Sequence, residues 1–192
     1  LIIPVSNQLF QDEISNLYAY LGRWFGKKLV LTQNQLVTGQ LGKLEASDLT
    51  AGSLVKGLKS ALNKALDPAI SRSAVIVTNQ DGFDALDQEE DGNKRPLLQP
   101  DIADGTQYKA LGRRIHVVSN SMLPSAGGKA PLYIGNMKQY MSLFRRIPLE
   151  LRSTDIGGNA FRTYSTEVRG VVRLGAASFD TGAAVARSIS VT

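Results

Sequence analysis

Residues 5–39, VSNQLFQDEISNLYAYLGRWFGKKLVLTQNQLVTG, contain the strongest secondary-structure signal in the chain. Apolar side chains recur there every three or four residues, as on one face of an amphipathic helix. The main stripe is Phe10, Ile14, Leu17, Leu21 and Trp24, and it is widened by Leu9, Tyr18 and Phe25. Ser6 or Asn7 can cap the start and Gly39 can end the helix. The pattern predicts a helix of about 25 to 30 residues, or roughly 40 Å at 1.5 Å per residue. Since Gly22 and Gly26 each lower helix propensity by about 1 kcal/mol relative to alanine, packing must stabilise it.

A second helix is predicted within residues 47–68, SDLTAGSLVKGLKSALNKALDP, with Pro68 following its end. Its buried stripe is expected to be Leu54, Leu58, Ala61, Leu62 and Ala65, and its solvent face Lys56, Lys59 and Lys64.

The rest of the chain contains short extended segments. Strands are predicted at 73–79, 113–119 and 131–136. Residues 147–174 are interpreted as two extended pieces around the turn DIGGN, and the polar alternation of the second piece is typical of an exposed or edge strand. The segment from Gly175 is small and poorly patterned. A long helix, a second helix and then mixed short strands indicate the α+β class.

Composition excludes several kinds of site. The 192 residues include no cysteine and one histidine, His116, so thiolate zinc sites, cysteine nucleophiles and multi-histidine centres are excluded. The net charge of +5, from 22 basic and 17 acidic residues, is a mild excess. No membrane span is expected, because no run of about 18 apolar residues occurs. The chain begins Leu1-Ile2-Ile3-Pro4 without methionine, and we interpret it as a fragment of a longer protein.

Residues 77–102, VTNQDGFDALDQEEDGNKRPLLQPDI, resemble a calcium-binding loop at first sight. Counting from Asp87 places Glu89, Asp91 and Gly92 at acceptable EF-hand positions. Position twelve, which needs a bidentate glutamate, is Leu98. A solvated acidic turn is therefore the favoured interpretation.

Other catalytic and ligand motifs fail in the same way. Gly42-Lys43 and Gly128-Lys129 lack both the first glycine and the hydroxyl residue of a phosphate-binding loop. His116 lies in an apolar run without a nucleophile elbow, and Glu89-Glu90 is an adjacent pair of the kind that is usually solvated. The sequence therefore predicts no catalytic, cofactor-binding or metal-binding residue.

Specific reading of DNA or RNA is not indicated either. The basic residues are spread out, and Arg113-Arg114 and Arg145-Arg146 are doublets, not patches. Aromatic residues make up 7% of the chain and are not interleaved with basic ones.

The order of these segments resembles the carboxy-terminal portion of tailed-phage major capsid proteins of the Hong Kong 97 type. Residues 5–39 resemble the long spine helix of that family, and LTAGSLVKGLKSALNKAL its next helix. AVIVTNQDGFDALDQEEDGNKRPLL resembles a strand that ends in an asparagine, Asn79, followed by a short helix and a polar turn. ALGRRIHVVSNSMLP, PLYIGNMKQYMSLFRRIPLEL and AFRTYSTEVRGVVRLGAASFDTGA follow in the family's order. The resemblance lies in this collinear order, because each motif alone is loosely defined.

The resemblance implies a division of the chain. Residues 1–70 would provide helices of a peripheral domain, 71–145 an axial domain, 146–175 return strands of the peripheral domain, and 176–192 a tail. The family's amino-terminal arm and extended loop are not found. Because Asn159 does not match the asparagine that cross-links some relatives, no cross-link chemistry is implied.

The implied function is structural. A major coat protein without enzymatic activity or cofactor would form pentameric and hexameric rings with itself, in an icosahedral virion shell around double-stranded DNA, assembled in the bacterial host cytoplasm. Scaffold, protease and portal proteins would be partners, contact with DNA would be non-specific, and no membrane would be involved. Two alternatives stay open at this point: an encapsulin-like nanocompartment shell, and a soluble enzyme or binding domain of unknown ligand.

Overall fold

The computed structural model describes residues 1–12, 14–49, 54–90, 96, 98–100 and 108–191. The chain divides into two compact units: unit 1 comprises 1–36 and 143–176, and unit 2 comprises 37–142 and 177–192. These bounds differ from the expected division in that 37–70 group with the segment 71–142, and so does most of the tail.

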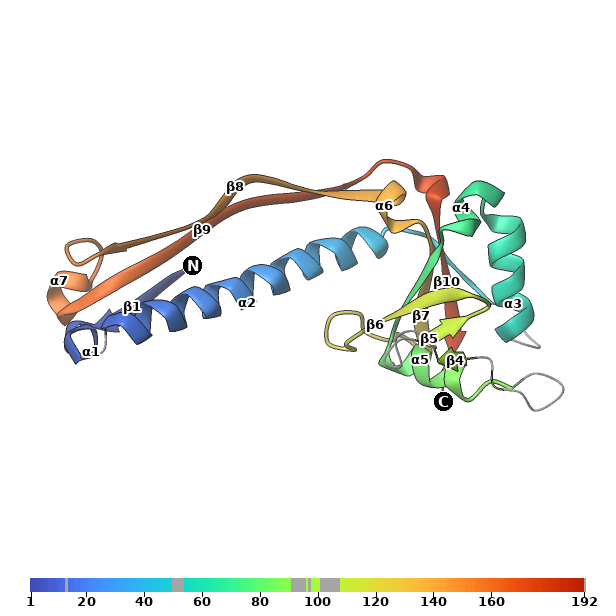
Figure 1. Cartoon of the computed structure of the whole chain (residues 1–192), viewed down its shortest axis with the longest axis horizontal. Helices are drawn as coiled ribbons and strands as arrows, with labels where there is room; N and C mark the ends of the chain where they lie inside the picture. The colour runs from blue at the N-terminus through green and yellow to red at the C-terminus, as the bar shows by residue number, and fades with distance from the viewer. Residues whose placement is uncertain (13, 50–53, 91–95, 97, 101–107, 192) are drawn as a thin grey trace. The chain divides into compact units, whose positions relative to one another are not determined.

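Unit 1 contains a three-stranded sheet in the order β1-β9-β8 (Figure 1). The strands are β1 (Ile2–Ser6), β8 (Met141–Thr154) and β9 (Ser165–Ser178), and β1 pairs antiparallel with β9 from Ile2↔Arg169 to Ser6↔Ser165. Of the two interpretations of the second extended piece, an edge strand is wrong, because β9 is the central strand, whereas alternate side chains at Arg169, Val171 and Arg173 are exposed. Its polar alternation arises because only one face of this sheet carries a core.

The core of unit 1 lies between this sheet and a long helix. Val5, Leu21, Phe25 and Val168 are buried together, with the partly buried Ile3, Phe10, Leu17, Trp24 and Leu149 around them. Gly170 in β9 faces the Phe25 ring so closely that an added Cβ would lie 2.5 Å from Cε1. Because side chains alternate along a strand, Glu167 and Arg169 point to the opposite face of the sheet.

The predicted long helix is confirmed as α2 (Ile14–Leu41), 28 residues long, and it follows the short α1 (Asn7–Asp12). Leu21 and Phe25 are buried as expected, but Leu9 and Tyr18 are about half exposed and do not widen the buried stripe. The side chain of Ile14 lies outside the described residues. None of the described helices is long and apolar enough to cross a membrane.

Unit 2 is built on a seven-stranded sheet in the order β2-β10-β7-β3-β6-β5-β4. Its strands are β2 (Ala46–Asp48), β3 (Val75–Asn79), β4 (Leu98–Pro100), β5 (Tyr108–Ala110), β6 (Arg113–Val118), β7 (Lys129–Gly135) and β10 (Ala184–Ser190). The pairs β3–β6 and β2–β10 are parallel, and the other pairs are antiparallel.

Both faces of the central strands are covered, which explains why their sequences are continuously apolar. Ile76 and Leu132 point into one cluster, with side chains from α3 (Leu54–Ser60), the π-helical turn η1 (Ala61–Ala65) and α5 (Gln80–Asp87). Their neighbours Val77 and Tyr133 point into the other, with Leu41 at the end of α2, α6 (Met137–Tyr140) and the 3-10 turn η2 (Thr181–Ala183). The short α4 (Pro68–Arg72) precedes β3.

Two expectations for unit 2 are wrong. Ala65 is exposed and Leu66 is buried in its place, because the wider π turn breaks the 3.6-residue spacing. Pro68 follows the end of the second helix as predicted, and it also begins α4, where Asp67 caps the helix by accepting from the Ala69 amide at 2.8 Å. The tail contains β10, an interior strand between β2 and β7.

Candidate interaction surface

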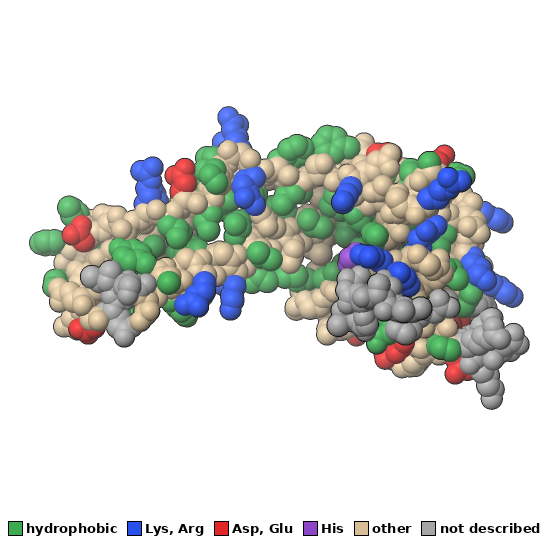
Figure 2. Space-filling model, viewed as in Figure 1, with side chains coloured by type: hydrophobic (Ala, Val, Ile, Leu, Met, Phe, Trp, Pro, Cys, Tyr) green, Lys and Arg blue, Asp and Glu red, His purple; other side chains and the backbone are tan. Residues whose placement is uncertain are grey.

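Exposed apolar side chains are concentrated in unit 1. Of seventeen large hydrophobic residues that are exposed in the described chain, three lie in unit 2: Tyr108, Val117 and Phe179. The other fourteen lie in unit 1: Leu1 before β1, and the rest on α1, α2, β1, β8, β9 and the segment between β8 and β9. Figure 2 shows hydrophobic side chains at the surface along α2 and the β8–β9 strands. Scattered exposed apolar residues are normal, but a concentration of this kind marks an interaction surface.

The most exposed of these side chains lie on one structure, the tip formed by residues 154–164. Ile156 is 80% exposed and Phe161 is 84% exposed. Phe161 belongs to α7 (Ala160–Thr163), which ends at Tyr164 in the left-handed conformation with φ 47°. Exposure of an apolar side chain to water is unfavourable. A partner that covers these side chains would therefore lower the free energy by removing apolar surface from water.

Local hydrogen bonds support this tip. The Thr154 hydroxyl accepts from the amides of Ile156 and Gly157, both at 3.4 Å. The Glu167 carboxylate accepts from the Asn159 amide at 3.3 Å. The tip is also joined to the start of α1, because the Asn7 amide donates to the Tyr164 carbonyl at 3.2 Å. The exposed side chains therefore lie on a turn that is hydrogen-bonded to β9 and α1.

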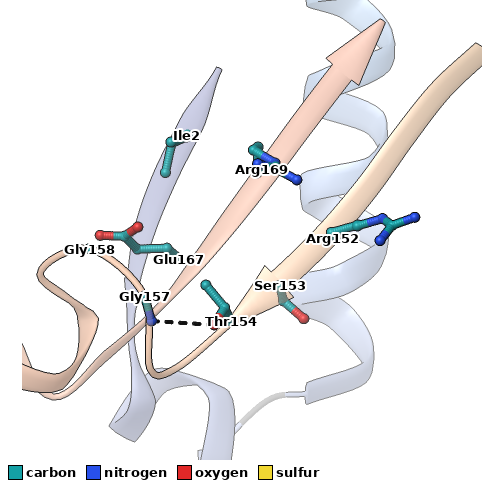
Figure 3. Close-up of a pocket in the computed structure, with 8 residues that line it drawn as sticks. All are labelled: Ile2, Arg152, Ser153, Thr154, Gly157, Gly158, Glu167 and Arg169. Atoms are coloured by element: carbon teal, nitrogen blue, oxygen red, sulfur yellow. Dashed lines mark hydrogen bonds between the residues drawn. The ribbon is translucent and has the colours of Figure 1, made fainter. Parts of the chain in front are cut away.

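A pocket of about 360 Å³ lies beside the tip (Figure 3). It is lined by Ile2, Arg152, Ser153, Thr154, Gly157, Gly158, Glu167 and Arg169. Arg152 comes from β8 and Arg169 from β9, and their guanidinium groups point away from the Glu167 carboxylate, which lies toward Gly158 (Figure 3). Gly158 has φ +60°, a conformation that strains other residues, and an added Cβ would lie 2.8 Å from Glu167 Oε2, so the carboxylate would have to move.

Unit 1 also carries most of the excess positive charge. Its bounds include nine basic residues, Arg23, Lys27, Lys28, Arg145, Arg146, Arg152, Arg162, Arg169 and Arg173, and five acidic ones, Asp12, Glu13, Glu150, Asp155 and Glu167. Among the described residues of this unit, Arg152 forms an ion pair with Glu150 at 3.8 Å, and both side chains are at least half exposed. A pair so long and exposed is worth little.

The acidic stretch that resembles a calcium loop has a structural role. Asn79 is fully buried and caps α5 by accepting from the Gly82 amide at 2.8 Å, while its amide donates to the Leu123 carbonyl at 3.0 Å and to Ser125 Oγ at 2.7 Å. Asp81 accepts from Asn120 and from Ser125, each at 2.6 Å. Hydrogen bonds from Ser125 and Asn120 lower the pKa of Asp81. This network fastens the β3–α5 connection to the segment after β6.

The described residues of the candidate calcium loop have other contacts. Leu98, at the position of the closing ligand, is buried in β4, and Glu89 Oε1 accepts from the Leu54 amide at 3.2 Å. Asp91 and Gly92 lie outside the described residues. In the part of the chain that the structure describes, no three His, Asp or Glu side chains are grouped to hold a metal ion.

The two Gly-Lys segments are turns. Gly42 follows α2 and its amide donates to the Thr38 carbonyl at 2.9 Å. Gly127 and Gly128, with φ +60° and +70°, form the turn before β7, and Lys129 forms an ion pair with Asp48 at 2.6 Å. His116 is exposed on β6. The sequence did not single out the tip or its pocket, because the residues involved are brought together by the register of β1, β9 and β8.

Comparison with known proteins agrees with this architecture. A model of the phage capsid family matches residues 1–188. No curated protein matches the chain.

Several solved structures share the fold. The capsid of a native GTA particle is 14% identical with a TM-score of 0.78, over 99% of this chain and 72% of that one. The SrpI encapsulin of Synechococcus elongatus is 13% identical with a TM-score of 0.71, over 100% and 73%. A structure of Mycobacterium phage Che8 is 15% identical with a TM-score of 0.63, over 97% and 68%. At such identities the likeness concerns the fold.

Proposed function

Because the chain belongs to the phage capsid family and is a structural capsid protein, we propose that it is the major coat subunit of a tailed phage or prophage. Many copies would meet in rings of five and six and close an icosahedral shell around double-stranded DNA. Assembly would take place in the cytoplasm of the bacterial host, and the product would be the virion capsid. Scaffold, protease and portal proteins would be its partners.

The observation that carries this proposal is the concentration of exposed apolar side chains in unit 1 of a chain that matches a capsid family along 188 residues. A subunit that works alone has no use for such a surface, whereas a shell subunit covers it with neighbours. Individually weak contacts suffice, because each copy is held by several neighbours at once. Unit 1 would be the peripheral domain and unit 2 the axial domain.

Contact with the packaged genome would be non-specific. The net charge of +5 reduces repulsion from phosphate groups, and the basic excess in unit 1 places most of that charge there. A coat subunit of this kind catalyses no reaction. A metal or cofactor is not part of the proposal.

Electron microscopy of the protein produced alone in bacteria tests the proposal. Closed shells of uniform diameter are the expected result. A clean monomer that stays dispersed at high concentration, both alone and when its scaffold and protease partners are produced with it, would refute the shell function.

An encapsulin-like nanocompartment is the second candidate, because the SrpI encapsulin shares the fold at a TM-score of 0.71. Mass spectrometry of nuclease-treated shells separates the two. A stoichiometric cargo enzyme inside the shells would favour the nanocompartment, and shells that fill with DNA in the presence of a packaging motor would favour the phage coat.

A further inference from the structure

A short segment in unit 2, residues 44–49, covers the outer edge of β10, and we call it the strap. It contains β2, whose three residues are all exposed. β2 runs parallel to β10 in the register Ser188↔Asp48, and the Leu49 amide donates to the Ser188 carbonyl at 3.1 Å. Since β2 is the end strand of the seven-stranded sheet, β10 would be an edge strand without it.

Apolar side chains anchor the strap at its two ends. Leu44 is partly buried against the core cluster on one face of the sheet, and Leu49 against the cluster on the other face. Leu49 also packs closely on α3, because a Cβ added at Gly57 would lie 3.0 Å from Leu49 Cδ2. Between these ends, residues 45–48 are exposed. Polar contacts must therefore hold the middle of the strap on β10.

Asp48 makes the main polar contacts of the strap. Its carboxylate accepts from Lys129 Nζ at 2.6 Å and from the Ser188 hydroxyl. Because Lys129 belongs to β7, the Asp48 side chain spans β10 and connects three strands. Ser47 Oγ accepts a further hydrogen bond from the Arg187 guanidinium at 2.6 Å. Hydrogen bonds from Lys129 and Ser188 lower the pKa of Asp48, so the carboxylate stays ionised at neutral pH.

These contacts lie in water, and this limits their strength. The Lys129 and Asp48 side chains are 46% and 63% exposed. Exposed ion pairs contribute little to stability and are screened by salt. Segments with few buried side chains open locally while the rest of a domain stays folded. The strap has these properties, whereas β10 beneath it contributes buried side chains to both core clusters.

We propose that the strap opens and closes as a unit while the rest of unit 2 stays folded, and that the Asp48 contacts determine how often it opens. Opening uncovers the Ser188 N–H and C=O on β10. Such groups at a sheet edge pair readily with a strand of another chain. The strap is thus a reversible guard over this edge. The device belongs to the folded subunit and is independent of the proposed coat function.

Residue-resolved hydrogen exchange of the full chain tests the proposal. The N–H and C=O of one strand residue point the same way, so the Ser188 amide faces the strap, whereas the Ile189 amide faces β7. Asp48→Ala should accelerate exchange at Ser188 by at least about tenfold, because hydrogen bonds to a charged group are lost. Exchange at Ile189 should stay within about twofold. Salt should accelerate Ser188 exchange in the wild type, and this effect should vanish in Asp48→Ala.

Two matched variants separate the Asp48 contacts from a general loss of stability. Asp67→Ala removes another exposed aspartate of unit 2, the cap of α4, and it should leave the ratio of Ser188 to Ile189 exchange unchanged. Asp48→Lys combined with Lys129→Asp exchanges the two charges. This pair should recover most of the slow exchange that Asp48→Lys alone loses.

A disulfide tests the opening without weakening the strap. Ser47 and Arg187 are register partners on neighbouring strands, about 4.8 Å apart, and the chain has no cysteine of its own. In Ser47→Cys with Arg187→Cys, oxidation should slow exchange at Ser188, and a reducing agent should restore it. If Asp48→Ala accelerates exchange equally at Ser188 and Ile189, or if oxidation leaves Ser188 exchange unchanged, the strap does not open on its own and the proposal is overturned.

Discussion

Gly170 is the position at which a single added methyl group should damage unit 1 most clearly. It lies in β9 opposite Phe25, a side chain only 3% exposed. In Gly170→Ala the new Cβ would lie 2.5 Å from Phe25 Cε1, 2.6 Å from Cδ1 and 3.3 Å from Leu151 Cδ2. Since carbon atoms in contact stay about 3.5–4.0 Å apart, the ring must move by about 1 Å or the strand must shift.

Overpacking of this kind typically costs about 1–3 kcal/mol of unfolding free energy. The Trp24 ring lies 5.3 Å from the Phe25 ring in an edge-to-face arrangement, and it is the single tryptophan of the chain. Urea denaturation followed by tryptophan fluorescence therefore reports on this cluster directly. Gly170→Ala should unfold at clearly lower urea concentration than the wild type.

Gly175→Ala is the matched control, because it lies on the same strand and an added Cβ meets no atom within 4 Å. It should change the unfolding free energy by less than about 0.5 kcal/mol. In a double-mutant cycle, Phe25→Leu should relieve part of the penalty of Gly170→Ala, with a coupling energy of about 1 kcal/mol or more. If Gly170→Ala and Gly175→Ala change the unfolding free energy equally, close packing of Phe25 against Gly170 is not the reason that glycine is needed there.

Three other perturbations follow from the structure. Asn79→Ala should lower the unfolding free energy by about 2–4 kcal/mol, since it removes the α5 cap and leaves the buried Leu123 carbonyl without its donor. Urea denaturation followed by circular dichroism measures this change. A loss below about 1 kcal/mol would contradict the role of the network. The lowered pKa of Asp81 means that its stabilising effect is fully present above the ordinary aspartate pKa and is lost as pH falls through the folded pKa. The difference in stability between wild type and Asp81→Asn should therefore shrink between about pH 5 and pH 3, whereas a constant difference would argue against an ionised Asp81 in the network. Gly22→Ala and Gly26→Ala should each raise the thermal midpoint and increase the unfolding free energy by up to about 1 kcal/mol, because alanine has the higher helix propensity. An added Cβ meets nothing within 4 Å at either position, so no clash opposes this gain. A loss of stability in either variant would contradict the prediction.

Helices and strands with continuous patterns of bulky apolar residues could be predicted from the sequence. Strands built from small residues, or interrupted by proline, could not. The stripe of α2 and the buried strand β3 were predicted because bulky apolar residues recur there with a clear period. β10 was missed because its buried positions include Ala184 and Ala186, which become core residues only against the large Tyr133 side chain. β1 was missed because Pro4 argues against a strand, yet a proline is tolerated here since β1 lies at the edge of its sheet.

The tip and its pocket depended on information of another kind. Arg152, Arg169 and Ile2 are far apart in sequence, and they meet because Ile2 pairs with Arg169 across β1 and β9 while β8 lies beside β9. A strand register of this kind is not encoded in the local pattern of any one segment. Asp155 and Ile156, in contrast, lie in the turn DIGGN that the sequence placed between two extended pieces.

The positions of β9 and β10 in their sheets also determine when each unit can fold during synthesis. Ile2 cannot form its strand pair until Arg169 has been synthesised. The seven-stranded sheet is likewise incomplete until residues 184–190, which form the interior strand β10, have left the ribosome. At about 5–20 residues per second, roughly 8–33 s separate the synthesis of Ile2 from that of Arg169. During this interval β1 has no partner strand, and the apolar face of α2 has no sheet to cover it. Each unit therefore closes late in the synthesis of these residues, through pairing of strands that are distant in sequence.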